Sequence, residues 1–195
     1  MNIGIICYAS VGGSGIVATE LGKALARRGH EVHFISTEMP FRFGEFQAGL
    51  SFHQVLTPTY PLFREPQYLL SLSNKIVQVA REFRLDVIHA HYAIPHATAG
   101  FLSRQVLGAH GGVAPRVVTT LHGTDITLIG SDPSYSEIVA YSIDQSDAVT
   151  AVSKSLRTST YEQLGVRRNI AVIPNFLDCA IHRRNHVNEL RQRFT

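Results

Sequence analysis

Short apolar runs alternate with longer amphipathic stretches along most of this chain. The runs are rich in β-branched residues and several are apolar at almost every position, which is typical of buried parallel strands. The pattern predicts strands at Ile3–Cys7, Glu31–Ser36, Ser51–Val55, Asp86–Ala90, Arg116–Leu121, Ala148–Val152 and Ile170–Ile173. Helical spacing is found at Gly15–Arg28, Tyr68–Arg84, Pro95–Leu107, Ser134–Gln145 and Ser153–Leu164.

This alternation of strands and helices predicts the fold class. Strand–helix repeats favour a parallel sheet with helices on both faces. We therefore expect an α/β fold with a Rossmann-like, doubly wound, mainly parallel sheet. Residues 40–67 are rich in aromatic residues and prolines, and interrupt the alternation as a long excursion with one strand inside it. We assign residues 1–174 to one domain and residues 175–195, with their Arg- and His-rich tail, to a crossover that begins a further domain.

The composition narrows the class of protein only a little. Hydrophobic residues make up 45% of the chain and charged residues 17%, as in ordinary soluble globular domains. The net charge of +3 fits an anionic small molecule as well as nucleic acid, and we expect no nucleic-acid partner. No apolar run reaches eighteen residues, so we expect no membrane span. The two cysteines, Cys7 and Cys179, lie far apart, which favours a reducing, cytoplasmic location.

A glycine-rich loop joins the first predicted strand to the first predicted helix. Gly12, Gly13, Ser14 and Gly15 allow the backbone to approach a ligand closely and leave free N–H groups at a helix N-terminus. Such a site binds phosphate or carboxylate groups. The loop therefore predicts an anion site without identifying the anion.

The same loop formally matches a dinucleotide fingerprint. Gly13, Gly15 and Ala18 fit G-x-G-x-x-A, which also requires an acidic residue about twenty positions further on, at the end of the second strand. That strand ends at Ser36, and Glu38 follows slightly late. A nucleotide-dependent oxidoreductase and a purely structural turn are thus alternatives, and we favour an anion or sugar-nucleotide site.

Polar clusters follow several of the predicted strands. Ligands of open α/β sheets bind beyond the carboxyl ends of the strands, where these clusters would meet. They are the glycine-rich loop, His89-Ala90-His91-Tyr92, His122-Gly123-Thr124-Asp125 and Ser153-Lys154. Their convergence from distant parts of the sequence predicts a binding site at this edge.

The histidines of these clusters allow two interpretations. His89 and His91 alternate along a strand, so both could face one metal ion. No acidic residue lies close by to complete a ligand set, and we favour histidines that bond to backbone or substrate, with no metal. His122, at a strand tip, is expected to contact a bound sugar hydroxyl. Asp125 either caps the following turn or builds the site, and Ser153 is expected to be a helix N-cap.

Several motifs together resemble a known family. Val11-Gly12-Gly13, Gly29-His30-Glu31-Val32, Asp86–His91, Thr119–Gly123 and Ala151-Val152-Ser153 are similar, in the same order, to the N-terminal domain of retaining family 4 glycosyltransferases with two Rossmann-like domains (the GT-B fold). The resemblance extends to Pro174–Asp178, which looks like the crossover into the second domain. It implies that this chain is the acceptor side of such an enzyme.

Within that family, the residues from Cys7 to Gly22, from His89 to Ala97 and from Leu121 to Thr127 are similar to enzymes of bacillithiol biosynthesis. The resemblance implies UDP-N-acetylglucosamine as donor, L-malate as acceptor, retention of configuration, and no cofactor or metal. It assigns a catalytic role to His122. Substrate binding is implied for Gly12, Gly13, Ser14, Tyr92, Thr120, Thr124 and Asp125.

Further expectations follow from what the chain lacks. The resemblance places the nucleotide clamp in a second domain, so we expect this chain to be inactive, or nearly so, alone. A free-standing ligand-binding domain and a family 4 glycosyltransferase with another acceptor are the alternatives. A homo-oligomer is also considered.

Overall fold

Seven parallel strands form one sheet in the order β3-β2-β1-β4-β5-β6-β7. The structure, a computed structural model, describes residues 1–9, 12–44, 47–59, 61, 62, 65, 67–109, 111, 113–177 and 179. All seven predicted strands are confirmed. Their bounds are β1 Asn2–Ile6, β2 Glu31–Ser36, β3 Leu50–Gln54, β4 Val87–His91, β5 Arg116–Leu121, β6 Ala148–Ala151 and β7 Ile170–Val172.

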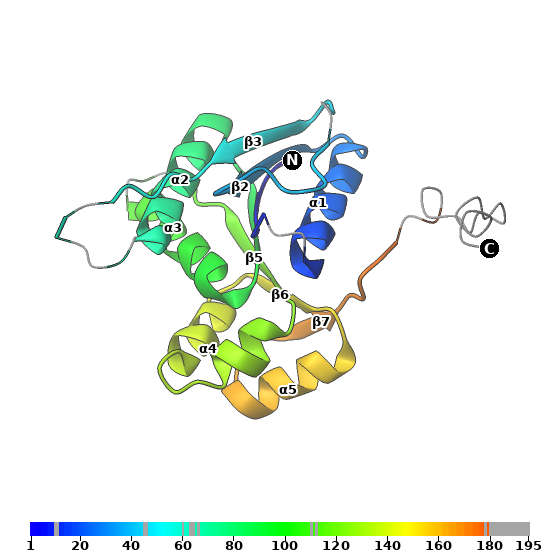
Figure 1. Cartoon of the computed structure of the whole chain (residues 1–195), viewed down its shortest axis with the longest axis vertical. Coiled ribbons are helices and arrows are strands. Elements are labelled where there is room, and N and C mark those ends of the chain that lie inside the picture. The colour runs from blue at the N-terminus through cyan, green and yellow to red at the C-terminus, as the bar shows by residue number, and fades with distance from the viewer. Residues whose placement is uncertain are drawn as a thin grey trace, which may run out of the picture.

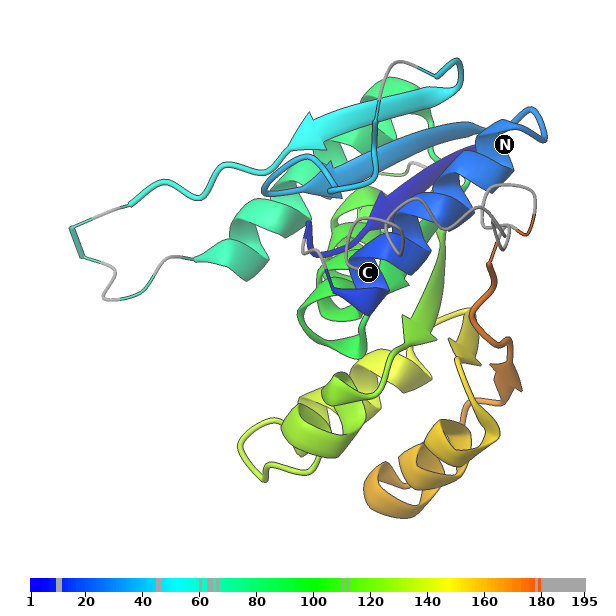
Figure 2. The ribbon, with the colours of Figure 1, turned by 45° about the vertical axis from the view of Figure 1, so that its right-hand side comes forward.

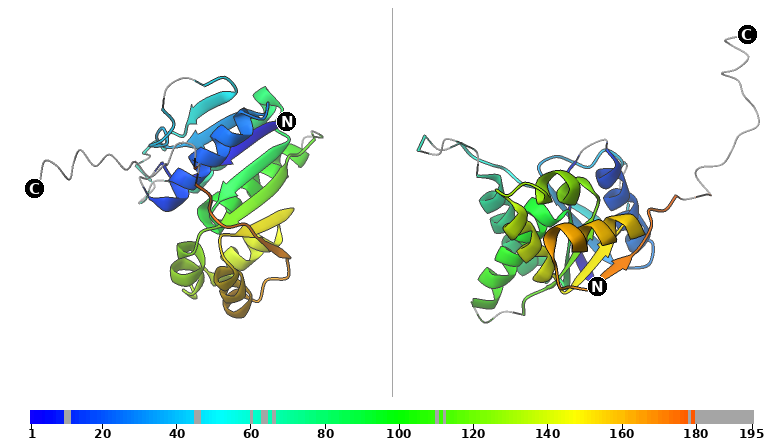
Figure 3. Two further views of the ribbon diagram at one scale, coloured as in Figure 1. Left: turned by 90° about the vertical axis from the view of Figure 1, so that its right-hand side faces the viewer. Right: turned by 90° about the horizontal axis from the view of Figure 1, so that it is seen from below.

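Helices cover the two faces of the sheet unequally (Figures 1 and 2). Helix α1 packs alone on one face, over β1, β2 and β3. The other face carries the four remaining helices, which pack on the sheet in two apolar clusters. Figure 3 shows that strands β4 to β7 carry no described helix on the face where α1 lies. The bounds are α1 Gly13–Ala26, α2 Tyr68–Phe83, α3 Thr98–Ala109, α4 Ser136–Asp144 and α5 Lys154–Leu164.

The alternation of side chains along each strand explains this division. In β1, Ile5 faces the cluster with α1, whereas its neighbour Ile6 packs against α2 on the opposite face. Both side chains are fully buried. Central strands must therefore be apolar at successive positions, which is why their runs are nearly continuous in the sequence.

The strand order reverses direction between β1 and β4. From β1 the chain crosses through α1 towards β2, whereas from β4 it crosses through α3 towards β5 on the opposite face. Loops that leave these two strands separate, and open doubly wound sheets bind ligands in the crevice between them. The glycine-rich loop and Tyr92 follow these two strands directly. The predicted α/β, Rossmann-like class is confirmed, and the sheet is parallel throughout the described strands.

Two short π-helical segments were not predicted. They are η1 (Ala93–Ala97) and η2 (Asp125–Gly130), which follow β4 and β5 at the carboxyl edge. The helix predicted from Pro95 agrees with the structure, because Ile94 is the only residue of η1 with non-helical φ/ψ (−127°, 137°), as is usual before proline, and η1 continues directly into α3 at Thr98. Ser153 is confirmed as an N-cap, since its hydroxyl accepts a hydrogen bond from the Leu156 amide at 3.1 Å.

Candidate functional site

The first turn of α1 presents backbone donors at the carboxyl edge of the sheet. Gly12 is the N-cap and supplies no side-chain cap, and the first turn contains no acidic residue. Ser14 is 8% exposed, and Gly12 and Gly13 are open to solvent. The free N–H groups and the positive end of the helix dipole favour an anion here. Ser10 and Val11 of the loop lie outside the described residues.

Tyr92 leaves β4 in a strained backbone conformation. Its φ of 96° is rare for a residue with a side chain, and its N–H donates to the Thr120 carbonyl at 3.0 Å. The Tyr92 ring lies 5.6 Å from the Tyr8 ring and 5.2 Å from the His122 ring, centroid to centroid. Strain of this kind persists where the surroundings fix it, which is common at binding sites.

Asp125 joins the ends of β4 and β5. Its carboxylate is fully buried and accepts hydrogen bonds from the amides of Ala93 (3.1 Å), His122 (3.2 Å) and Gly123 (2.9 Å). Burial raises the pKa of this carboxyl, and the three amides oppose that rise. Asp125 thus caps the local turn, as predicted, and also holds the start of η1 after β4. Contact with a substrate stays a prediction.

Three histidine rings form a stack over the ends of β4 and β5. The His89 and His91 centroids lie 4.6 Å apart, and those of His91 and His122 lie 5.1 Å apart. His91 Nδ1 and His122 Nε2 share a hydrogen bond of 2.9 Å. Among the described residues, no group of three His, Cys, Asp or Glu side chains could hold a metal ion.

Burial keeps these histidines neutral at physiological pH. It lowers the pKa of His89, His96 and His122 to about 4 each. For His91, burial together with the three neighbouring histidines lowers the pKa well below its ordinary value of 6.5. Neutral imidazoles each offer one donor and one acceptor, so hydrogen bonding rather than charge defines their chemistry here.

Thr120 and Thr124 differ in their surroundings. The Thr120 hydroxyl lies 2.8 Å from His89 Nε2 and 2.8 Å from the Thr150 hydroxyl, in a chain that crosses β4, β5 and β6. Thr124 is exposed and makes no side-chain cap to η2. Thr120 therefore lies within the sheet face, whereas Thr124 is free to meet a ligand.

Tyr8, Tyr68 and His96 also belong to this edge and were not in the predicted set. The Tyr8 and His96 rings are 4.4 Å apart, and the Tyr68 hydroxyl lies 3.4 Å from His96 Nε2. Tyr8 could have been predicted from the sequence, because it directly follows the first predicted strand and so lies at the carboxyl edge of the sheet. His96 lies in η1, at the start of the helix predicted from Pro95, and its contacts with Tyr8 and Tyr68 could not be predicted from periodicity.

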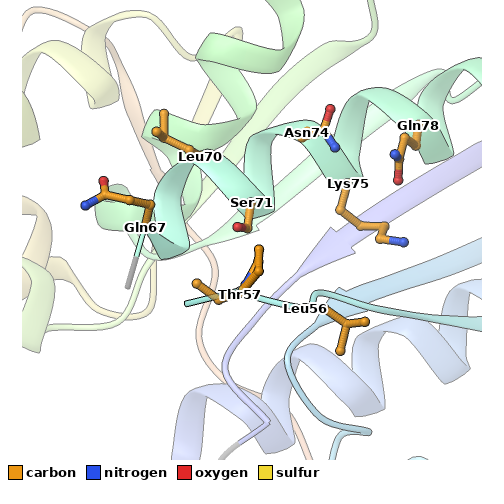
Figure 4. A pocket seen from close by; sticks show the side chains of 9 residues that line it. Leu56, Thr57, Gln67, Leu70, Ser71, Asn74, Lys75 and Gln78 are labelled. Carbon is orange, nitrogen blue, oxygen red and sulfur yellow. The ribbon is translucent and has the colours of Figure 1, made fainter. Parts of the chain in front are cut away.

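A large cavity lies elsewhere on the molecule. It measures about 1020 Å³ and lies between the segment after β3 and the first half of α2 (Figure 4). Its lining includes Leu56, Thr57, Leu70, Ser71 and Lys75, and none of the predicted site residues.

No helix in the described part of the chain is long and apolar enough to cross a membrane.

Comparison with known proteins identifies the class. Over the whole chain the fold matches a structure titled Anabaena Alr3699/HepE in complex with UDP-glucose (TM-score 0.69, 19% identity, 50% of that chain). It also matches a Rickettsia africae glycosyltransferase over 92% of this chain and 44% of that one (TM-score 0.67, 18% identity). The fold is that of one half of a GT-B glycosyltransferase. Residues 11–181 match the family described as Glycosyltransferase Family 4, and the chain belongs to that family.

One curated relative is considerably more similar. The chain is 45% identical over 194 residues to N-acetyl-alpha-D-glucosaminyl L-malate synthase from Bacillus anthracis, a match over 100% of this chain and 50% of the synthase. It is 26% identical over 168 residues to the uncharacterized glycosyltransferase MJ1178 of Methanocaldococcus jannaschii, over 86% of this chain and 44% of that protein. The chain thus spans about half the length of the curated relatives it matches.

Proposed function

We propose that this chain is the acceptor-binding half of a glycosyltransferase that moves N-acetylglucosamine from UDP-N-acetylglucosamine to L-malate with retention of configuration. This would be the first step of bacillithiol biosynthesis. The observation that carries the proposal is the 45% identity to the Bacillus anthracis synthase over the whole chain. The predicted division into residues 1–174 and 175–195, and the second domain that would hold the nucleotide, belong to the same proposal.

The first turn of α1 is the proposed carboxylate site. L-malate is a dianion, and the amides of Gly13 and Ser14 are donors at the positive end of a 14-residue helix. Ser14, in the first turn of α1, and Tyr92, directly after β4, both lie in segments that follow strands at the carboxyl edge. In the proposal, Gly12, Gly13 and Ser14 bind the acceptor, while Tyr92, Thr120, Thr124 and Asp125 orient the substrates directly or through the backbone.

His122 is the proposed catalytic contact to the donor sugar. In the reaction the malate hydroxyl attacks the anomeric carbon, the bond from that carbon to the diphosphate breaks, and the hydroxyl proton passes to a leaving phosphate oxygen. This route requires neither a protein nucleophile nor a metal within this half. The contribution of the chain is to position the reactants and stabilise charge.

Product analysis of the full-length protein tests the proposal. UDP-N-acetylglucosamine is incubated with L-malate, D-malate, L-lactate and glycerate, and products are identified by mass spectrometry and by the anomeric coupling in NMR spectra. We expect an α-linked malate glycoside and at least tenfold slower transfer to the monocarboxylates, which lack one anionic contact. Transfer only to another acceptor would retain the family and reject malate, and an inverted product would reject retention.

The remaining expectations form part of the same proposal. The chain alone is expected to give no product, because it spans 50% of the Bacillus anthracis synthase and the nucleotide site is proposed to lie in the other half. Cys7 and Cys179 are both free, which supports a reducing, cytoplasmic location. The predicted homo-oligomer stays a prediction.

A further inference from the structure

His91 lies behind His122 and is completely enclosed. The residue is 0% exposed, and its Nδ1 shares the 2.9 Å hydrogen bond with His122 Nε2. Its other ring nitrogen, Nε2, is buried and has no hydrogen-bond partner among the described residues. Of the buried side-chain nitrogen and oxygen atoms in the described part of the chain, only this nitrogen and the Ser36 hydroxyl lack a partner. An unpartnered buried atom of this kind calls for an explanation.

A single proton lies between the two rings, since both imidazoles are neutral. In one arrangement His91 donates through Nδ1–H, and its buried Nε2 is a bare acceptor. In the other arrangement His122 donates through Nε2–H, and His91 must then bury an N–H group without a partner. Orphaned buried N–H groups are rarer than under-satisfied acceptors, so the first arrangement is favoured.

Neighbouring His96 shows the same tautomer by a stricter argument. Its Nδ1 lies 2.5 Å from the His91 carbonyl oxygen, which can only accept. His96 therefore carries its proton on Nδ1, and its Nε2 accepts from the Tyr68 hydroxyl. Both hydrogen bonds of His96 to the described residues are satisfied by a neutral ring.

We propose that His91 is a positioning residue that holds His122 in its Nδ1–H tautomer, so that His122 meets a substrate oxygen as a neutral hydrogen-bond donor. With His91 donating, His122 Nε2 is an acceptor and the only proton on the His122 ring is on Nδ1. The His122 Nδ1 atom is absent from the buried, unpartnered set and has no partner among the described residues, so it is not enclosed and can meet a ligand. His122 is thereby a donor and not a general base.

This inference rests on the proposed function for the identity of the substrate oxygen. A donor suits a sugar hydroxyl or an oxygen that gains negative charge as the glycosidic bond changes partners. A base is not needed at this position, because the leaving diphosphate accepts the acceptor's proton. The tautomer itself is a property of the free protein and is independent of any substrate.

Nitrogen NMR spectroscopy of the 15N-labelled, 195-residue chain at pH 7 measures the tautomer directly. Signals of His122 are assigned by their loss in His122→Gln. We expect a protonated Nδ1 and an unprotonated Nε2 for His122, and the same for His91. A protonated Nε2 on His122 in the unaltered protein would overturn the proposal without any variant.

Two substitutions separate positioning from packing. The amide nitrogen of His91→Asn takes the place of Nδ1 and can still donate, so His122 should keep its Nδ1–H form. His91→Leu fills the space without a donor, and His122 should then populate both tautomers. An unchanged His122 spectrum in a folded His91→Leu protein would contradict the proposal, and if that variant does not fold, the His91→Asn spectrum decides alone.

Kinetics of the full-length enzyme supply a second readout. His91→Leu should lower kcat in proportion to the fraction of His122 that leaves the Nδ1–H form, on the order of twofold to tenfold, with little change in the KM for malate and well short of the 10²–10³-fold loss when a donor to developing charge is removed outright. His91→Asn should match the unaltered enzyme. Equal losses in both variants would assign His91 a merely structural role. Absence of product from the unaltered enzyme would reject the proposed function and leave the NMR result standing.

Discussion

At the scale of single residues, buried neutral histidines make the protein sensitive to acid. The pKa of His96 is lowered by burial from 6.5 to about 4, and the residue is 0% exposed. Below pH 6.5 the unfolded chain binds a proton that the folded protein does not bind until about pH 4. The stability from this shift is therefore complete above pH 6.5 and is lost as the pH falls towards 4, by about 3 kcal/mol in total.

Replacement of His96 should flatten that dependence. His96→Asn keeps a donor near the His91 carbonyl but removes the titrating ring. Near pH 5 the slope of unfolding free energy against pH should fall by about 1.4 kcal/mol per pH unit, which is one proton. Urea unfolding at pH 4.5, 5, 5.5 and 7 measures it.

Tyr68→Phe is the matched control for this experiment. It removes the hydroxyl that donates to His96 Nε2 but leaves the ring that titrates. Stability should fall at every pH while the slope remains. An unaltered slope in His96→Asn would show that this ring does not titrate differently in the folded and unfolded states.

The strained backbone at Tyr92 can be measured by comparing two small residues. At a φ of 96°, alanine retains the steric conflict of a Cβ atom and glycine does not. We expect Tyr92→Gly to be more stable than Tyr92→Ala by about 1–2 kcal/mol in urea unfolding. At Tyr141, inside helix α4, the same pair should reverse its order, because alanine is the better helix former. Equal stabilities at Tyr92 would argue against the strain.

At the scale of elements, a glycine in α1 sets how closely the helix approaches the sheet. A Cβ on Gly22 would lie 2.3 Å and 2.8 Å from two ring carbons of Phe34 and 3.2 Å from Ile5. Gly22→Ala should therefore destabilise the protein by about 1–3 kcal/mol, although alanine is the better helix former.

The same substitution in α3 should have the opposite sign. Gly108 is exposed and a Cβ there would meet nothing within 4 Å. Gly108→Ala should stabilise the helix by about 0.5–1 kcal/mol. Thermal or urea unfolding of both variants checks the pair, and a stabilising Gly22→Ala would show that α1 can shift away from β2 at little cost.

The strands and helices of this fold could be predicted better than the contacts between them. Strands β1 to β7 could be predicted because burial on both faces requires continuous apolar runs, and strand–helix alternation then fixes the parallel class. Pairs across strands could not be predicted from periodicity. The contact of His91 with His122 depends on the register that aligns His91 with Thr120, and Asp125 bonds Ala93 from 32 residues away. The sequence thus indicated which edge carries the site, but not how its polar groups pair.

At the scale of the whole molecule, of the described α-helices, four pack on one face of the sheet and α1 alone packs on the other, which separates stabilisation of the fold from the proposed ligand binding. Helices α2 to α5 and their apolar clusters stabilise one face, whereas the N-terminus of α1 is the proposed anion site at the carboxyl edge. Acceptor binding should therefore be a property of this chain by itself, even though sugar transfer is proposed to need the remainder of the enzyme. A ligand that binds the folded chain raises its stability, so thermal unfolding with ligand tests whether this chain binds the acceptor by itself.

L-malate should raise the thermal stability of the 195-residue chain. At 100 times its Kd, a ligand that binds only the folded state adds about 2.7 kcal/mol, or roughly 5–10 °C in Tm for a chain of this size. Ser14→Ala should reduce this shift because it removes a donor beside the helix N-terminus, whereas its unfolding without ligand should change little. Ser155→Ala, the same change in the first turn of α5, should leave the shift intact.

Thermal unfolding with NAD tests the remaining alternative, a nucleotide-dependent oxidoreductase. An oxidoreductase would bind the dinucleotide through the glycine-rich loop and gain stability from it, whereas an acceptor domain would not. The second strand supports the acceptor domain, because it ends at Ser36 and the nearest carboxylate, Glu38, follows two residues after the strand end where a ribose-binding acid is expected. A Tm that rises with NAD and not with malate would therefore reassign the loop to a nucleotide. A rise with malate that Ser14→Ala abolishes would assign it to the acceptor.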